Sequence, residues 1–262
     1  MKLKLFYNKS VNENAAHYYE LAKESKEKSA GVEKAMEETE KEIKEAKKPE
    51  KKDVRIKRAK EWFEKFHFFL TSSGKLAIGG RSAQQNDLLV SKHMEEKDLF
   101  FHADIQGGSV VILKDGIDAD EQEMQECAQF AGCFSNAWKN GNASVDVYCA
   151  KKEQLSKNVS GGFIQSGAFA ITGERKWFKN TKLSLRIGIG GKESAEKEAG
   201  GKSVILVPDI SKTCLKDELV LFPTNSGKDK GALAKSLAKR FSVHPDEFLE
   251  LLPNGKTKTS QK

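Results

Sequence analysis

The chain has 262 residues, 38% hydrophobic and 32% charged, and its 45 Lys and Arg against 38 Asp and Glu give a net charge of +7. The length and the 15 Phe and 3 Trp residues suffice for a buried core, which excludes a largely disordered protein. No apolar run approaches a membrane span and the N-terminus lacks a signal-peptide pattern, so a cytoplasmic protein with no membrane partner is expected.

The first elements in the chain are helical. From Val11 to Ala46, residues suited to a coiled-coil seam recur at alternating intervals of four and three over five heptads. Ser10 or Asn12 can cap the start of this helix. Several seam positions are Ala, Ser or Thr, so the helix needs a partner to be stable.

A second helical run follows the Lys48-Pro49 break and extends from Ile56 to Leu70. Folded back, it would cover only about half of the first seam at the usual rise of an α-helix. The rest of the seam therefore predicts a partner helix on another chain. The alternative is a solvated, charge-rich single helix.

A compact α+β domain is predicted from near Trp62, because strands and helices segregate in part and the hairpins are short. A Ser-Ser-Gly turn separates two strands within residues 62–80, and a helix then runs to about His93. The further elements expected are strands at 98–104, 109–114, 145–153, 166–178, 183–189 and 202–210, and helices at 118–139 and 230–252. The predicted domains are a coiled-coil arm over 1–61, a globular domain over 62–223, and a helical unit with a basic tail over 224–262.

Charge is distributed unevenly along this domain. Residues 95–126 contain 10 acidic and 2 basic side chains, whereas residues 151–192 contain 9 basic and 2 acidic ones. A basic region set against an acidic one favours a partner with a phosphate backbone. The alternative is a lysine-rich solvated surface.

Motifs for catalysis and for metal binding fail on inspection. The four cysteines lack CxxC spacing, which argues against a disulfide framework and a zinc site. The segment GIGGKES at 188–194 has Arg186 and Glu193 where a Walker loop requires Gly and Ser or Thr. We therefore expect no metal, no cofactor and no nucleotide hydrolysis.

His102 and Asp104 are the one close His/Asp pair, two residues apart on a predicted strand. Such a pair can act as a base and the group that orients it. It can equally be a structural pair, or contact phosphate and a ribose hydroxyl. Because the sequence places no third catalytic group nearby, we expect that the protein is not an enzyme.

A family resemblance begins at the same residues. WFEKFHFFLTSSGKLAIGGRSAQQNDLLV, DLFFHADIQGG and SGAFAITGERKWF resemble the NFACT-R domain of the NFACT family, the RqcH-like ribosome quality-control factors. The closing LLPNGK is similar to archaeal members, and KLKLFYNKSVNENAAHYYE resembles the start of the family's second coiled-coil arm. The resemblance implies binding to large ribosomal subunits that carry stalled peptidyl-tRNA, and a part in untemplated tailing of the nascent chain.

The resemblance leaves out the family's N-terminal tRNA-engaging domain, its helix-hairpin-helix domain and its first coiled-coil arm. This agrees with the half-bare seam deduced from heptad spacing. Together they suggest the C-terminal half of a split or truncated NFACT protein, whose coiled-coil partner is the N-terminal half or a second copy.

Several residues are predicted to contact RNA. Arg81 after two glycines can fork onto phosphate, and Gln85 and Asn86 open a helix whose N–H groups favour anions. His102 can donate to phosphate or to a ribose hydroxyl, and Asp104 can hold His102 or Arg81 in place. Non-specific electrostatic attraction is assigned to Lys65, Arg175, Lys176 and Lys179. Trp62, Phe66 and Phe68 are interpreted as core residues.

The sequence therefore predicts an RNA-binding component of ribosome-associated quality control that contacts large-subunit rRNA or tRNA. The alternative is a coiled-coil scaffold for protein partners, with an RNA-processing enzyme as a distant third.

Overall fold

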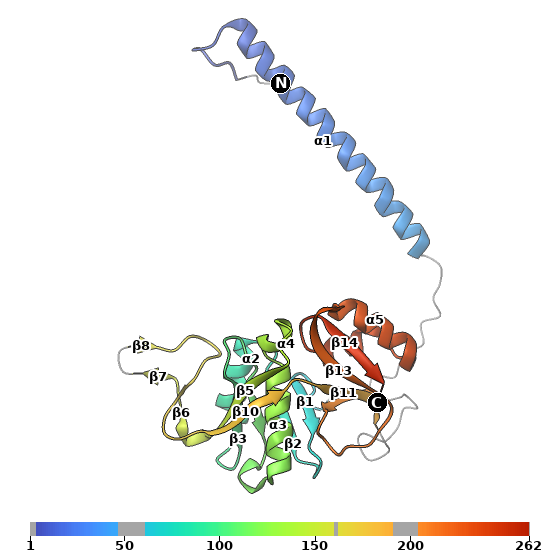
Figure 1. The fold of residues 1–262 in the computed structure, drawn as a ribbon. Coiled ribbons are helices and arrows are strands. Elements are labelled where there is room, and N and C mark those ends of the chain that lie inside the picture. Colours follow the sequence, from blue (N-terminus) through green and yellow to red (C-terminus); the bar gives the residue numbers. More distant parts are fainter. Residues whose placement is uncertain (1–3, 47–60, 160–161, 191–203, 262) are drawn as a thin grey trace. The chain divides into compact units, whose positions relative to one another are not determined.

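The computed structural model describes residues 4–46, 61–159, 162–190 and 204–261 (Figure 1). The chain divides into two units, the first within residues 1–57 and the second within residues 58–262. Helices and antiparallel sheets make up the protein, which confirms the predicted α+β class. In these ranges no helix is both long and apolar enough to cross a membrane.

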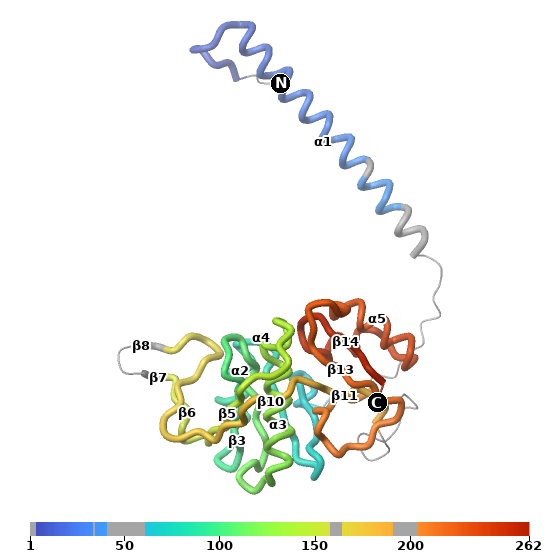
Figure 2. The backbone as a smooth tube through the Cα atoms, viewed as in Figure 1, coloured from blue at the N-terminus to red at the C-terminus, as the bar shows by residue number. Residues whose placement is uncertain are grey.

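The first unit contains one long helix, α1 (Val11–Ala46), as the heptad spacing predicts (Figures 1 and 2). Ser10 and Glu13 cap its start reciprocally: Glu13 N donates to Ser10 Oγ over 3.3 Å, and Ser10 N donates to Glu13 Oε2 over 2.7 Å. The seam residues Val32 and Met36 are 59% and 60% exposed.

Residues before α1 fold back onto its first turns. Buried Asn14 accepts a hydrogen bond from the Phe6 amide over 2.9 Å and donates to the carbonyls of Phe6, Lys9 and Ser10. Tyr18 Oη accepts from the amide of Lys4 and donates to its carbonyl. One polar side chain thus pairs with four backbone groups of this turn.

The second unit is built on a six-stranded antiparallel sheet with the order β1-β2-β4-β3-β5-β10. Among the described residues, β10 lies at one edge and pairs with β5 alone. The strands are β1 (His67–Leu70), β2 (Leu76–Gly79), β3 (Leu99–Ala103), β4 (Val111–Leu113), β5 (Ser144–Lys151) and β10 (Lys176–Lys182).

Core residues pack on both faces of this sheet, because successive side chains of a strand point to opposite sides. Phe101 packs in the cluster that includes the apolar face of α3 (Glu121–Cys133), whereas Phe100 packs in a second cluster with Leu89. Helical segments supply residues to both clusters: α2 (Ala83–Leu88), the π-helical turn η1 (Leu89–His93), α3, and α4 (Asn136–Lys139).

The strand predicted over 166–178 is divided in the structure. Its first part forms short β9 (Ala170–Ile171), which pairs with β6 (Leu155–Ser156), and β10 begins at Lys176. Asp87 of α2 anchors this segment, accepting hydrogen bonds from Ser166 Oγ over 2.7 Å and from the Gly167 amide over 3.0 Å. Short elements nearby are η2 (Gly116–Asp118), η3 (Lys152–Gln154), β7 (Asn158–Val159) and β8 (Gly162–Phe163).

A second antiparallel sheet has the order β12-β11-β13-β14 and shares a core with the first. The predicted helical unit over 230–252 is confirmed as two helices, but the basic tail is not a tail, since residues 257–261 form β14 and pair with β13. The elements are β11 (Leu185–Gly190), β12 (Val204–Pro208), β13 (Leu215–Lys228), α5 (Lys230–Phe241), α6 (Pro245–Leu251) and β14 (Thr257–Gln261).

Two buried carboxylates of α3 hold the Ser-Ser-Gly turn between β1 and β2. Glu126 accepts from the Ser72 amide over 3.0 Å. Glu123 accepts from Thr71 Oγ1 over 2.9 Å, from Lys75 Nζ over 3.1 Å and from Ser73 Oγ. Burial alone would raise the pKa of Glu123, but hydrogen bonds from Ser73, the Asp120 amide, Thr71 and Lys75 lower it to about 2.

This depressed pKa predicts a pH-dependent contribution to stability. The ionised Glu123 stabilises the fold above pH 4.5, and the contribution disappears as the pH falls toward 2. Glu123→Gln is therefore expected to lose about 3 kcal/mol of unfolding free energy at pH 7 and much less at pH 3. Urea unfolding at both pH values measures this; Glu121→Gln, on the exposed side of the same helix, is the control. Equal losses at both pH values would contradict the assignment.

Candidate nucleic-acid interface

Asn86 clamps together two loops of the predicted motif, the one at Gly80 and the one at Gly108. It is buried, its Oδ1 accepts from the Val110 amide over 3.2 Å, and its Nδ2 donates to the Gly108 carbonyl over 3.5 Å. Gly80 leaves room for it, since a Cβ there would lie 2.1 Å from Asn86 Oδ1. Asn86 therefore joins the start of α2 by hydrogen bonds to the segment at Gly108 and Val110 and packs against Gly80, so its side chain faces inward.

His102 packs beneath the second glycine pair. A Cβ on Gly108 would lie 3.0 Å from the imidazole ring, so glycine permits this close approach. Burial lowers the pKa of His102, and contacts with the backbone at Ala103 and Gly108 and the charge of Asp104 offset this only in part. The imidazole is therefore neutral near pH 7 and contributes no positive charge.

Tyr148, and not Asp104, is the hydrogen-bonding neighbour of His102, with Tyr148 Oη 3.4 Å from His102 Nδ1. Within the described ranges no hydrogen bond joins His102 to Asp104, whose amide donates to the Asp146 carbonyl over 2.7 Å. Asp104 is exposed and acts on His102 through its charge. The structure therefore joins His102 to Tyr148 by a side-chain contact and leaves Asp104 without a hydrogen bond to the imidazole.

Three aromatic side chains lie opposite one another across β3, β5 and β10. His102 pairs in register with Tyr148, and Tyr148 pairs with Trp177. The ring centroids are 5.8 Å apart in the first pair and 5.4 Å in the second. We call His102, Tyr148 and Trp177 the aromatic row.

Two cations lie on the aromatic row. The Arg175 guanidinium carbon is 4.9 Å from the Tyr148 ring centroid, and Lys179 Nζ is 4.1 Å from the Trp177 centroid. A cation in such a position is attracted to the ring, because the face of an aromatic ring carries a negative electrostatic potential. The row is thus flanked by positive charge on the strand that forms the sheet edge.

Lys176 is on the opposite side of β10. It pairs with Glu121 of α3, and its Nζ lies 3.6 Å from Met124 Sδ. The neighbouring Phe178 is buried on that same side against Phe101. The structure therefore separates Lys176 from Arg175 and Lys179, with which the sequence groups it.

Three other predicted residues form a group around the start of α2. The Arg81 amide donates to Gln85 Oε1 over 2.9 Å, and its guanidinium donates to the Phe66 carbonyl over 3.1 Å. Gln85 Nε2 donates to the Lys65 carbonyl over 3.4 Å, and Lys65 Nζ lies 5.0 Å from the Phe66 ring centroid. Arg81 remains exposed, as the sequence predicts. Contacts through Asn86 and Gly108 link this group to His102.

The aromatic residues before β1 divide between core and surface. Phe66 is fully buried, and Phe68 is partly buried beside Phe63. Trp62 is 45% exposed and stacks on His93 with ring centroids 4.6 Å apart. The interpretation of Trp62 as a core residue is therefore wrong.

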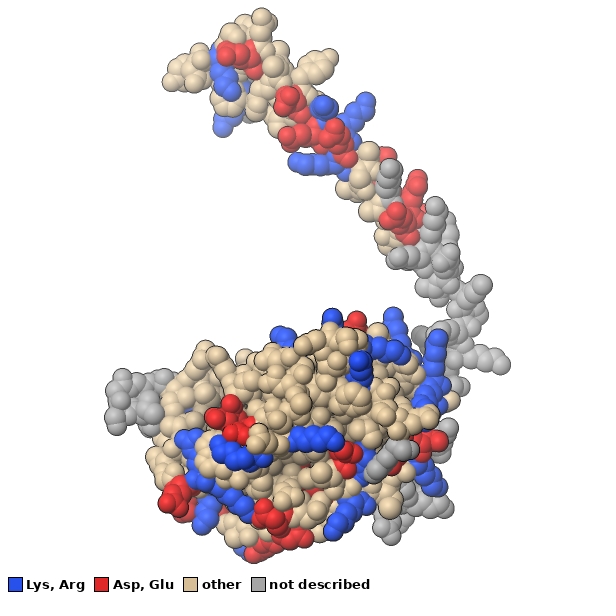
Figure 3. Space-filling view, in the orientation of Figure 1, with Lys and Arg blue, Asp and Glu red and all other residues tan. Residues whose placement is uncertain are grey.

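Basic side chains of residues 151–192 form ion pairs with carboxylates, including Glu96 and Glu121 of the acidic stretch. Lys152 lies 3.7 Å from Glu96, Lys176 pairs with Glu121, and Lys179 Nζ lies 2.8 Å from Asp146. Figure 3 shows Lys and Arg side chains interspersed with Asp and Glu on the face in view. An RNA phosphate that binds Lys179 must therefore displace a carboxylate.

Tyr148 and Trp177 were not predicted as site residues. A signal for Trp177 is present in the segment Arg175-Lys176-Trp177-Phe178-Lys179, where basic and aromatic residues interleave. Tyr148 has no such local signal. It joins the site only through the register of β5 with its neighbours.

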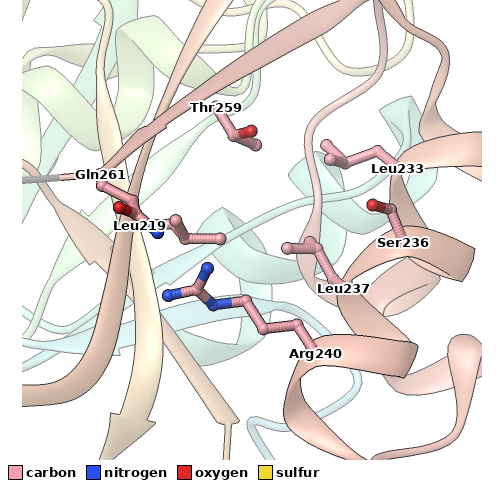
Figure 4. Close-up of a pocket in the computed structure, with 7 residues that line it drawn as sticks. All are labelled: Leu219, Leu233, Ser236, Leu237, Arg240, Thr259 and Gln261. Atoms are coloured by element: carbon pink, nitrogen blue, oxygen red, sulfur yellow. The ribbon is translucent and has the colours of Figure 1, made fainter.

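A cavity of about 340 Å³ lies away from all the predicted residues, between α5 and strands β13 and β14 (Figure 4). Its leucines are almost fully buried and belong to the core. Arg240 is the charged residue in its lining, which consists of Leu219, Leu233, Ser236, Leu237, Arg240, Thr259 and Gln261. It lacks the interleaved cations and aromatic rings found on the aromatic row.

Residues 65–173 match the family model described as the NFACT protein RNA binding domain. The archaeal Rqc2 homolog aRqcH of Methanocaldococcus jannaschii is 34% identical over 206 residues, which are 77% of this chain and 30% of that protein. The human ribosome quality control complex subunit NEMF is 29% identical over 181 residues, which are 66% of this chain and 17% of that protein.

A solved structure, the C-terminal part of the fibronectin/fibrinogen-binding protein of Streptococcus suis, covers 66% of this chain and 77% of its own, with a TM-score of 0.40 and 21% identity. The chain spans less than a third of the length of the archaeal and human relatives. The matched domain contains the motif loops, His102 and Tyr148, and ends just before β10. The chain belongs to the NFACT family of RqcH-like proteins, and residues 65–173 are its NFACT RNA-binding domain.

Proposed function

We propose that this protein is a non-enzymatic RNA-binding component of ribosome-associated quality control in the cytoplasm. Its target is the large ribosomal subunit with stalled peptidyl-tRNA, contacted through rRNA, tRNA or both. Support comes from the match to an RNA-binding domain and from relatives named as ribosome quality control subunits. The observation that carries the proposal is the placement of Arg175 and Lys179 on the rings of the aromatic row.

The surface chemistry favours binding over catalysis. A guanidinium and an ammonium group beside aromatic rings can contact phosphates, and a neutral imidazole can donate to a phosphate or a ribose hydroxyl. The Nδ1 atom of His102 contacts the Tyr148 hydroxyl, and no hydrogen bond from Asp104 orients the imidazole among the described residues. Arg81, Gln85 and Lys65 form a second contact region beside α2, while Asn86 positions the loops.

We further propose that α1 forms a coiled coil with a helix outside this chain. Val11, Val32 and Met36 belong to the predicted seam and are 59–85% exposed. Burying such residues against a partner helix is how coiled coils gain stability. The partner would be the N-terminal part of an NFACT protein or a second copy, and the chain itself the C-terminal part of a split or truncated one.

Co-sedimentation with purified large ribosomal subunits over a series of salt concentrations tests the proposed function. Phosphate contacts release counterions, so binding should weaken steeply and linearly on a double-logarithmic plot against salt. Nuclease-treated subunits should bind less of the protein. If binding depends neither on the salt concentration nor on nuclease treatment, the result would favour the protein-scaffold alternative and contradict RNA recognition.

A further inference from the structure

Resting on the proposed RNA-binding function, we propose that Trp177 stacks on an unpaired RNA base, so that the aromatic row selects single-stranded over fully paired RNA. The positive charges beside the row would bind the backbone on either side of that base. The proposal concerns which class of RNA the surface accepts.

The placement of the row on the sheet supports base stacking. Its three residues occupy facing positions on adjacent strands β3, β5 and β10 and therefore share one face of the sheet. Aromatic side chains on a sheet surface are a recurrent platform for unpaired bases, because every base offers a flat π-face. The bases of an RNA duplex are stacked inside the helix and do not reach such a platform.

Trp177 is the member of the row that is open to a ligand. It is 38% exposed, whereas Tyr148 is 9% exposed and His102 is packed beneath Gly108. The alternation of β10 puts Phe178 in the core and leaves Trp177 on the other side of an edge strand. The planes of the Tyr148 and Trp177 rings meet at 67°, so Tyr148 packs against the indole in an edge-to-face contact and helps to hold it in place.

The cations beside Trp177 are placed to bind the sugar–phosphate backbone. Lys179 and Asp146 form a surface pair in which the lysine side chain is 60% exposed. Such pairs are weak and exchange readily, so a phosphate can replace the carboxylate while a base replaces the ammonium over the indole. Arg175 is held on Tyr148, one position along the same face, where its guanidinium can fork onto a second phosphate.

Binding of an unstructured RNA oligonucleotide and of a blunt RNA duplex of equal length tests the proposal. Trp177→Ala is expected to weaken single-strand binding by about 5- to 150-fold and to leave duplex binding nearly unchanged. Trp177→Phe should restore most of the affinity, since a phenyl ring still stacks. Trp62→Ala is the matched control, because Trp62 is also exposed but lies outside the row.

Fluorescence gives a second readout that does not depend on the alanine variant folding. In a Trp62→Phe protein the emission comes from Trp177 and from Trp138, which is fully buried. Saturating single-stranded RNA should quench the Trp177 emission, and the duplex should not.

Three results would overturn the proposal: full single-strand affinity in folded Trp177→Ala, equal loss for single strand and duplex, or no quenching. If Lys179→Glu still weakened both RNAs, the RNA-binding function would stand and base stacking alone would fail. Unchanged binding in both variants would overturn the function as well.

Discussion

Replacing both Arg175 and Lys179 by glutamate is expected to weaken RNA binding at least about tenfold, because each charged hydrogen bond to phosphate is worth roughly 1.5–3 kcal/mol. The slope of log affinity against log salt should fall by about 2, since two counterions fewer are released. The effect follows from the positions of Lys179 on β10 and of Arg175 just before it, both over rings of the aromatic row. Filter binding or fluorescence anisotropy across a salt series measures both quantities.

Lys176→Glu is the matched control for Lys179→Glu. Both lysines are on β10, both pair with a carboxylate, and both substitutions change the net charge equally. Lys176 lies on the side of β10 that faces α3. The Lys176→Glu substitution should therefore lower the affinity for RNA only through the change in the overall electrostatic potential of the protein. Equal effects from the two substitutions would show that RNA responds to net charge and not to this surface.

Gly80→Ala is expected to destabilise the second unit by about 2–5 kcal/mol, through overpacking and the loss of a buried hydrogen bond. The new methyl would lie 2.1 Å from Asn86 Oδ1 and 2.9 Å from the Asn86 backbone nitrogen. Because that nitrogen belongs to α2, a side-chain rotation cannot relieve the clash. Displacing Asn86 would leave the Val110 amide without its acceptor.

Urea unfolding followed by tryptophan fluorescence measures this loss. Gly74→Ala is the comparison: its φ is +92°, and a Cβ there meets nothing within 4 Å. It therefore reports the cost of backbone strain alone, about 1 kcal/mol for a left-handed residue. If Gly80→Ala unfolds at the same urea concentration as the wild type, Asn86 does not clamp the two loops as described.

Local patterns were enough to predict most elements of the fold. The long helix α1, the helix at α3 and the hairpins around the sequence turns are all specified by spacing, caps and glycine positions within a few residues. β13 and β14 were missed for physical reasons. β13 contains Pro223 and a polar second half, and Thr257 is the one buried residue of β14. Their pairing depends on residues distant in the chain, which local periodicity does not report.

The candidate site was predicted in part. The basic residues Arg175 and Lys179 were identified from charge, but sequence alone did not reveal that Lys176 faces away from them. The RNA contacts assigned to Asn86 and His102 stay predictions, but the structure adds that the Asn86 side chain is hydrogen-bonded to Gly108 and Val110 and that His102 packs against Gly108. A polar residue in a motif can stabilise the fold or contact a ligand. Its burial distinguishes these two roles, and burial is seen in the structure and not in the sequence.

The pairing of β14 with β13 has a consequence for how the protein is made. Trp138 is fully buried, and its indole Nε1 donates to Thr257 Oγ1 over 3.0 Å, a link between residues 119 positions apart. A ribosome releases the chain from its N-terminus, and domains fold as units once their residues have emerged. Because both sheets share one core, the core stays incomplete and the indole has no native acceptor until Thr257 leaves the exit tunnel. Completion of the fold of a protein proposed to act on stalled ribosomes thus waits until β14 has emerged.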